Sequence, residues 1–504
     1  MTGIYRWPAG VGFFFCFIGA SLTIGGSAAA QDGSSTYAFD NSPEPLSLDY
    51  TRDEAPPAGQ PVHNWTCSGC GEDFSDVVPY GYEGDNPLCQ KCGQNRDAGK
   101  QGCDLLTTKR LTGDWWGART AMEDAGVSFV PLLITNFQQN FRGGANTHNG
   151  HDITGRFFYN AELDFEKMLG WRGATFFYRA VQEWNNGIGS DVGTTLAPYW
   201  GSGAPGNHFY GDSPYCILTD KWWYRQRLLD DRIEIRLGKL LNVVDLFDKN
   251  AVSGNYASAF MNRALNYSQT IPVAKGTGAF VKMWPTDWLY FQTAAVNADS
   301  RDSRCFDYER AFHGPAHYVG HWEFGLTPKF DSANGELPGN YRFGWWYNPR
   351  MRDVFMDTLG GLRAQQTESG DVGWYMSFDQ MLLRENNDPK DAQGLGVFFR
   401  YGYAHGEINR IAHTWSVGTT YKGLIPRRDK DELGFGVAQC IESSQYRDEI
   451  DRRADRETVY ELYYAIELTP WCIVTPDIQV ITNPGGSQDA RDALVGGVRA
   501  KITF

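Results

Sequence analysis

Four cysteines near the N-terminus have the spacing of a metal site. Cys67 and Cys70 form one C-x2-C pair, and Cys89 and Cys92 form a second pair after eighteen intervening residues. Four thiolates on two tight turns make a closed tetrahedral shell of the kind that holds structural Zn²⁺. The four-cysteine module is too short to fold around an apolar core of its own. Metal or covalent links must therefore stabilise it.

The expected compartment gives the same thiols a second interpretation. Residues 1–30 have the features of a secretory signal, because Arg6 is the sole early charge, an apolar stretch covers 11–24, and an alanine triplet at 28–30 offers a cleavage site. Exported thiols enter an oxidising space, where disulfides form. The spacing favours zinc and the location favours disulfides. We predict a structural zinc site, with disulfides as the alternative.

A second pattern places charges on one face of a strand and apolar groups on the other. In residues 494–504, Leu494 and Phe504 fall on one face, whereas Arg499 and Lys501 fall on the opposite face. Such a strand has lipid on one side and water on the other. Outer-membrane barrels typically close with a strand that ends on an aromatic residue. We therefore predict a transmembrane β-barrel with Phe504 at its periplasmic end.

The same alternation recurs along the chain. In each case charged or polar residues oppose aromatic and aliphatic residues with a period of two, as expected for strands that separate lipid from a water-filled lumen. The segments are 157–166, 232–238, 322–327, 397–403 and 460–468. A soluble sandwich could also contain such strands, but their agreement in character favours the barrel.

Composition supports this fold class and excludes others. No apolar run long enough for a spanning helix follows the signal segment, mean hydropathy is negative, and aromatic residues make up 14% of the chain. This combination excludes a helical membrane protein and fits a barrel with aromatic girdles. The net charge of −14 argues against nucleic acid as a partner.

Short and long connections also alternate near the C-terminus. Turn signals at 426–429 and 469–471 are short, whereas 442–457 is long and charged. Counting back from a periplasmic Phe504 places the long loop outside the cell. This order puts Cys440 and Cys472 near opposite rims, so we expect that they do not pair.

Several collinear motifs resemble those of OprB-type carbohydrate-selective porins. They are LTGDWWGART at 111–120 with EDAGV at 123–127, LDFEKMLGW at 163–171, the stretch 222–239 ending in RLGK, and short motifs at 400–404, 421–424, 427–431, 475–479 and 483–486. The resemblance implies a barrel of about sixteen strands that passes sugars across the outer membrane by diffusion. Trp116 stands where many members have a second glycine.

The resemblance and the motifs together divide the chain into three parts. Residues 1–30 are the predicted signal peptide, 31–107 a periplasmic linker that carries the cysteine module at 67–92, and 108–504 the barrel. A short helix is expected over 113–126, with Gly126 at its end. The segment 31–107 has no counterpart that we recognise in the family.

A sugar channel needs hydrogen-bonding groups and aromatic faces on its wall. Charged and amide side chains exchange hydrogen bonds with hydroxyl groups, and aromatic rings stack on pyranose rings. We prefer Arg236, Arg400 and Arg499 for the constriction, because arginine presents a rigid fan of donors. The full set of candidates is Glu162, Arg232, Glu234, Arg236, Glu323, Arg342, Arg400, Glu461, Glu467, Gln479, Arg499 and Lys501, with Asp164 and Asp477 on the same face.

The predicted function is therefore passive, carbohydrate-selective diffusion of sugars through the outer membrane of a Gram-negative-type bacterium. The alternative is a structural barrel that contacts the cell wall through 31–107. An outer-membrane enzyme is less favoured, because the nine histidines form no convincing catalytic constellation with a nucleophile. Sugars and outer-membrane lipid are the expected partners, and a homotrimer follows from the resemblance alone.

Overall fold

The computed structural model describes residues 106–185, 187–196, 217–243, 245–254, 257–298, 317–355, 367–387, 392–450, 456–487 and 489–504. The predicted signal peptide and the cysteine module, with Cys67, Cys70, Cys89 and Cys92, lie outside these residues. Zinc and disulfides there stay predictions. No helix among the described residues is long and apolar enough to cross a membrane.

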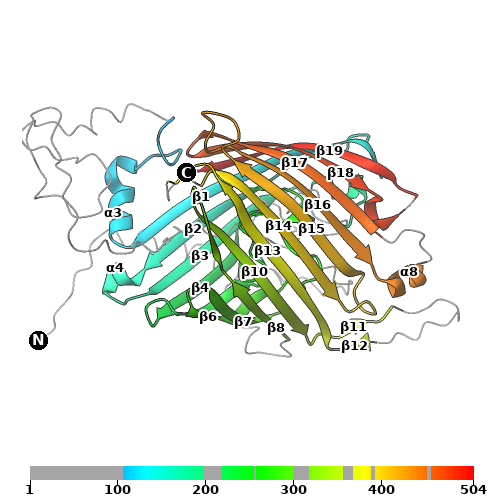
Figure 1. Ribbon diagram of the computed structural model, residues 1–504, viewed down its shortest axis with the longest axis horizontal. Helices are drawn as coiled ribbons and strands as arrows, with labels where there is room; N and C mark the ends of the chain where they lie inside the picture. Colours follow the sequence, from blue (N-terminus) through cyan, green and yellow to red (C-terminus); the bar gives the residue numbers. More distant parts are fainter. Residues whose placement is uncertain are drawn as a thin grey trace, which may run out of the picture. The chain divides into compact units, whose positions relative to one another are not determined.

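Sixteen antiparallel strands of the described residues close into a barrel (Figure 1). They are β1 (Val127–Gly144), β2 (His151–Asp164), β3 (Ala174–Trp184), β4 (Leu218–Leu228), β5 (Ile233–Leu241), β6 (Lys275–Thr286), β7 (Leu289–Asn297), β8 (Tyr318–Leu326), β10 (Gly335–Asn348), β13 (Asp371–Arg384), β14 (Gly394–Ala404), β15 (Ile411–Lys422), β16 (Glu432–Glu442), β17 (Arg456–Thr469), β18 (Cys472–Thr482) and β19 (Arg491–Thr503). Neighbours in this order pair with each other, and β19 pairs with β1. The predicted barrel of about sixteen strands is confirmed.

Smaller elements lie in the connections. β9 (Lys329–Ser332) extends the hairpin of β8 and β10, and β11 (Arg352–Asp353) pairs with β12 (Thr367–Glu368). The helices are η1 (Trp115–Gly117), α3 (Ala118–Asp124), α4 (Phe165–Leu169), α5 (Gly189–Val192), α6 (Arg263–Asn266), α8 (Ser444–Ile450) and η3 (Pro484–Gly486). These elements leave the sixteen-strand ring unbroken.

The two faces of the strands differ as the alternation predicts. On β19, the outward Val498 is 44% exposed, whereas the inward Arg499 is 1% exposed. Outward apolar side chains on other strands are also exposed, among them Phe137, Phe324, Phe343, Leu462 and Ile478. Successive side chains of a strand point to opposite faces, so one face meets lipid and the other the lumen.

The barrel has one end with short turns and one end with long loops. At the end that carries Phe504, β17 and β18 are joined by Pro470 and Trp471, and Thr503 donates to the Trp471 carbonyl at 2.9 Å. We call this the Phe504 end. At the opposite, loop end, residues 242–274 join β5 to β6. Cys440 and Cys472 lie near opposite ends, and both are free thiols, as expected.

The helix before the barrel is shorter than predicted. It was expected over 113–126, but α3 covers Ala118–Asp124. Gly113, Trp115, Trp116 and Gly117 all have positive φ values, which no α-helix accommodates. Gly126, at φ 88°, follows the helix as expected.

A carboxylate organises the turn between β15 and β16. Asp431 accepts two hydrogen bonds from the Arg428 guanidinium, both at 2.7 Å, one from the Tyr464 hydroxyl at 2.8 Å and one from the Glu467 N–H at 3.0 Å. Burial raises the pKa of Asp431, but these hydrogen bonds outweigh burial and leave the pKa below its ordinary value. The ionised carboxylate therefore stabilises this turn.

Asp431→Asn is expected to lower the melting temperature of the folded barrel at neutral pH. A carboxylate with a lowered pKa contributes stability above its unfolded pKa, and this contribution is lost as the pH falls through the folded pKa. The difference from wild type should therefore shrink in acid. Circular dichroism melts in detergent measure it, with the exposed Asp429→Asn as the matched control. An equal difference at neutral and acid pH would contradict this role.

Candidate channel and constriction

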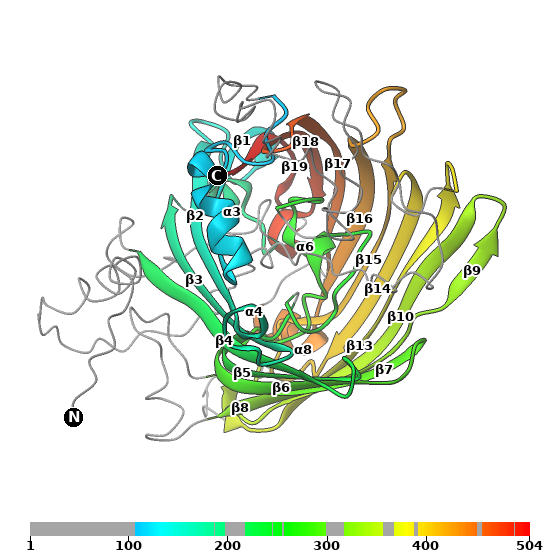
Figure 2. The same ribbon diagram turned by 90° about the vertical axis from the view of Figure 1, so that its left-hand side faces the viewer.

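One long loop folds into the barrel and narrows it. The connection between β5 and β6, here called the inner loop, covers residues 242–274 and contains α6. Figure 2 looks into the barrel from the Phe504 end and shows this loop inside the ring of strands. Most of its described side chains are buried, including Phe247, Phe260 and Leu265, each at 0% exposure. A surface loop would leave such groups in water, so this segment belongs to the lumen.

Asp248 of the inner loop is held by two strands of the barrel wall, β8 and β14. Its carboxylate accepts from Arg400 Nε of β14 at 3.0 Å and from the Ser268 N–H at 2.8 Å. Its own N–H donates to Glu323 of β8 at 3.0 Å. Arg400 also donates to the Leu265 carbonyl at 2.8 Å. The predicted site residues Glu323 and Arg400 thus both bind the inner loop.

Glu323 is also bound by neighbouring side chains of the wall. It accepts from the Tyr290 hydroxyl at 2.8 Å, from Gln292 Nε2 at 2.8 Å and from the Tyr375 hydroxyl at 2.5 Å. With the Asp248 N–H, four donors surround a carboxylate that is 1% exposed. A buried charge needs such complete hydrogen bonding, and the four donors hold the Glu323 carboxylate in one position.

Glu461 and Gln479 hold the other side of the inner loop. Glu461 of β17 accepts from the N–H groups of Met261 and Asn262 at 2.5 and 2.9 Å. Gln479 of β18 accepts from Asn262 Nδ2 at 3.0 Å and donates to Asp477 at 2.8 Å. These strands lie far from β5 and β6 in the ring. The loop therefore spans the lumen and is fixed at both sides.

Two inward glycines make room for the loop on the wall. A Cβ on Gly402 of β14 would overlap Ser268 Oγ and Thr270 Oγ1, and one on Gly436 of β16 would lie 2.8 Å from Leu265 Cδ2. Neither position has the left-handed backbone that would require glycine for its conformation. Close approach of the loop accounts for both glycines.

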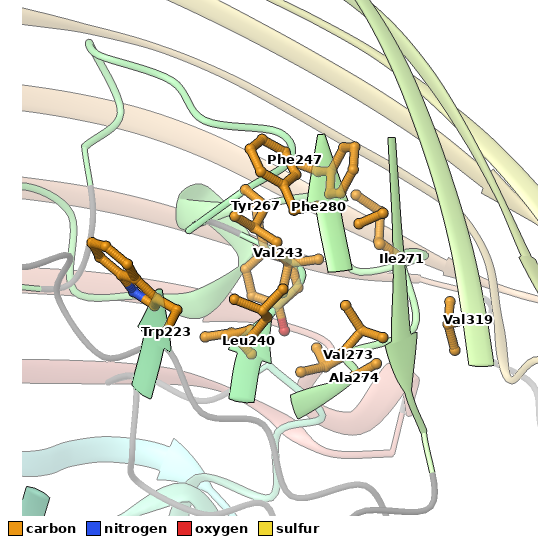
Figure 3. Packing of buried hydrophobic residues seen from close by; sticks show 14 of the residues in the cluster. Trp223, Leu240, Val243, Phe247, Tyr267, Ile271, Val273, Ala274, Phe280 and Val319 are labelled. Carbon is orange, nitrogen blue, oxygen red and sulfur yellow. The ribbon is translucent and has the colours of Figure 1, made fainter. Parts of the chain in front are cut away.

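Apolar packing supports the loop from the side of β5 to β8 (Figure 3). Phe247 contacts the Phe280 ring edge to face at a centroid distance of 6.1 Å, and it stacks on His321 at 5.1 Å. Tyr267 and Ile271 belong to the same buried cluster. Full burial of a large apolar side chain contributes about 1.5–3 kcal/mol, so the cluster favours the docked loop strongly.

A second loop closes part of the loop end. Residues between β3 and β4 include α5, and Ile188, Val192 and Leu196 are fully buried there. Glu457 at the start of β17 accepts from the Thr194 hydroxyl, from the Thr195 N–H at 3.0 Å and from the Gly485 N–H at 2.7 Å. This carboxylate ties together the β3–β4 and β18–β19 connections at the mouth.

A cavity of about 1640 Å³ lies inside the barrel at the Phe504 end. Exposed turn residues such as Arg172 and Asp230 line it at the rim. Deeper in the barrel it is lined by Glu162 of β2, Trp223 of β4 and Lys501 of β19. Its walls therefore combine carboxylate, cationic and aromatic groups, which suits hydroxyl-rich solutes.

Trp223 fixes two guanidinium groups beside this cavity. The Arg225 and Arg236 guanidinium carbons lie 5.5 and 5.0 Å from the Trp223 ring centroid. Phe177 stacks on the same indole at 5.0 Å. Trp223 itself is 4% exposed, so its main contact is with these neighbours. The cation–π contacts orient the two arginines beside the cavity.

The other candidates lie in three kinds of place. Glu234 pairs with Arg236 at 2.6 Å, Arg342 pairs with Asp379, and Arg499 donates to Thr475 at 3.1 Å; all three candidates are buried. Arg232 and Glu467 lie in or beside turns at the Phe504 end. They pair with Asp287 at 2.8 Å and with Lys430 at 2.9 Å. The candidates are thus divided between the loop contacts, the cavity wall, buried pairs on the strands and the rim.

Sequence reasoning missed the inner loop and its key residues. Asp248 and Asn262 were not singled out, and neither were Trp223 and Arg225. The available signal was the length of 242–274 together with its apolar content, which is unusual for an exposed connection. Such a segment is expected to be buried against something.

The chain can now be compared with known proteins. The sequence model of the family described as carbohydrate-selective porin, OprB family, matches residues 148–504. Porin B of Pseudomonas aeruginosa is 24% identical over 435 residues, which cover 79% of this chain and 92% of that protein. Porin AaxA of Chlamydia felis is 25% identical over 332 residues, covering 63% and 67% of the two chains.

A solved structure shows the same fold. The high-pH structure of Pseudomonas putida OprB superposes with a TM-score of 0.68 at 23% identity, covering 79% of this chain and 99% of that chain. The family model covers well over half of the chain, and it includes the strands from β2 to β19 that carry the inner loop. The chain belongs to the carbohydrate-selective porin family OprB.

Proposed function

We propose that this protein is a passive channel for sugars in the outer membrane of a Gram-negative-type bacterium. The observation that carries the proposal is a closed barrel whose lumen is narrowed by a buried loop and which keeps a cavity of about 1640 Å³ with charged walls. Relatives at this level of similarity are named porins, which supports a channel rather than an enzyme.

The cavity wall can replace the water of a passing sugar. The Glu162 carboxylate accepts hydrogen bonds from hydroxyl groups, and the Arg236 guanidinium donates them. Because each exchanged hydrogen bond changes the free energy little, the solute can enter and leave. We place the Phe504 end in the periplasm, so that sugars leave the cavity on that side.

Liposome swelling tests the proposal. Vesicles with the full-length protein should swell faster in glucose than in a neutral ethylene glycol oligomer of equal mass, because the oligomer has no hydroxyl array to match the wall. Vesicles without protein provide the baseline. Equal rates for the two solutes would reject selectivity for sugars but retain the pore, whereas no swelling in either would reject the channel.

The proposal also covers the oligomeric state of the barrel and the role of residues 31–107. A homotrimer is the assembly that we propose for the barrel, and contact with the cell wall is the role that we propose for residues 31–107. The homotrimer rests on the resemblance to carbohydrate-selective porins, and the cell-wall contact rests on the predicted periplasmic module. Chemical crosslinking in intact membranes tests the first, and deletion of 31–107 with a measurement of envelope integrity tests the second.

A further inference from the structure

The cavity at the Phe504 end carries more cations than carboxylates. Eight lysines and arginines and six aspartates and glutamates line it, although the whole chain has a net charge of −14. At the rim the charges are matched, because Arg110 pairs with Glu123 at 2.6 Å and Arg172 pairs with Asp230 at 3.1 Å. The excess positive charge therefore lies deeper in the cavity.

Arg225 and Lys501 are the deep cations without a carboxylate partner. Arg225 donates to Thr175 Oγ1 at 3.1 Å, and its Nε is buried without a hydrogen-bond partner. Lys501 forms no hydrogen bond or ion pair with any described residue, and the charge that acts on it, Arg499, has the same sign. Neither cation forms an ion pair with a described residue, and Glu162 and Glu234 act on Arg225 without contacting it directly. A ligand carboxylate would supply the direct partner that both cations lack.

Glu162 adds a feature that a site for simple anions would not have. Its carboxylate lines the same cavity and makes no direct hydrogen bond or ion pair with the described residues. Arg225, Arg227 and Arg236 lie within electrostatic reach of it. An inorganic anion would be repelled by this carboxylate, whereas a ligand with hydroxyl groups would donate to it.

We propose that this cavity is a subsite for acidic monosaccharides, such as uronates and aldonates. Arg225 attracts the ligand carboxylate, and Glu162, which lies within electrostatic reach of Arg225, accepts from the ring or chain hydroxyls. Lys501 is a second cation on the wall of the same cavity and raises the local concentration of anionic sugars. Trp223 is a positioning residue that keeps Arg225 and Arg236 in place. The assignment rests on the proposed function, because it gives the sugar channel a preferred class of solute.

Titration of the ion current through full-length channels in planar bilayers tests the subsite. Glucuronate should reduce the current at a concentration about tenfold lower than glucose, as one added charge-assisted hydrogen bond implies. Arg225→Gln should remove most of this difference, because it takes away the direct partner of the ligand carboxylate, and Lys501→Gln should remove part of it. Lys501→Arg should restore it. Lys329→Gln, which removes an exposed cation far from the cavity walls, should change neither titration.

Each alternative outcome of these titrations would contradict a different part of the proposal. Equal titrations with glucuronate and glucose would overturn the acidic subsite and leave the sugar channel standing, whereas no effect of glucose would overturn the proposed function itself. A preference that persists in both glutamine variants would overturn its assignment to this cavity. Acetate as effective as glucuronate would show selectivity for bare anions and would also overturn the subsite. Heat-modifiable electrophoretic mobility confirms that each variant is folded.

Discussion

Arg400→Met is expected to release the inner loop and to raise the single-channel conductance of the barrel. Arg400 is buried at 1% exposure, and it holds both the Asp248 carboxylate and the Leu265 carbonyl. Breaking a buried ion pair on one side costs about 3–5 kcal/mol, because the remaining charge stays without compensation. The equilibrium constant for docking of the loop should therefore fall by a factor on the order of 10²–10⁴.

Planar bilayer recordings and swelling in larger oligosaccharides measure this effect. Conductance and the size limit should both rise, and discrimination between glucose and a neutral oligomer should weaken. Lys430→Met is the matched control, because it removes a cation whose pair with Glu467 is exposed at the rim. A folded Arg400→Met barrel with wild-type conductance would contradict the proposal that the Arg400–Asp248 ion pair holds the inner loop in place.

A second substitution distinguishes loss of the Arg400–Asp248 ion pair from non-specific destabilisation of the barrel. Asp248→Asn in the Arg400→Met background removes the charge that the first change leaves uncompensated. Part of the docking free energy should return, so the double variant should be less open than Arg400→Met alone. Additive opening by the two changes would mean that the two side chains do not act as a pair.

The strands could be predicted from the sequence because their signal is local. The alternation at 494–504 puts Arg499 and Lys501 on the face opposite Leu494, and β19 has this arrangement. A period of two follows from backbone geometry alone, so it is readable without knowledge of the neighbouring strand. The turn positions followed from local turn signals, whereas the closing of about sixteen strands into a ring was implied by the resemblance to the porin family.

The constriction could not be predicted, because it depends on pairs far apart in the chain. Asp248 and Arg400 are 152 residues apart, and Met261 and Glu461 are 200 residues apart. Residue types show that Arg400 could donate hydrogen bonds, but they do not show that a loop already occupies those donors. The lumen-facing side of the strands is also less polar and less exposed to water than the alternation alone implies, because Phe158 and Phe398 are buried there.

Gly402→Val is expected to displace the inner loop by a purely steric route. The loop side of Gly402 is filled by the Ser268 and Thr270 hydroxyls, which bond to each other at 2.9 Å. Valine is favoured in strands, so β14 itself should tolerate the change. The overlap must instead be relieved by the loop, at a cost of about 1–3 kcal/mol.

The graded series Gly402→Ala and Gly402→Val should raise the conductance stepwise, and single-channel recordings in the same bilayers measure both. Ala279→Val is the matched control, because it adds bulk to the exposed, lipid-facing side of β6. Neither glycine variant changes a charge, so their effect should persist at high salt. If Gly402→Val folds with unchanged conductance, then contact between β14 and the inner loop does not set the width of the channel. If it opens the channel as Arg400→Met does, two unrelated forces support the same constriction.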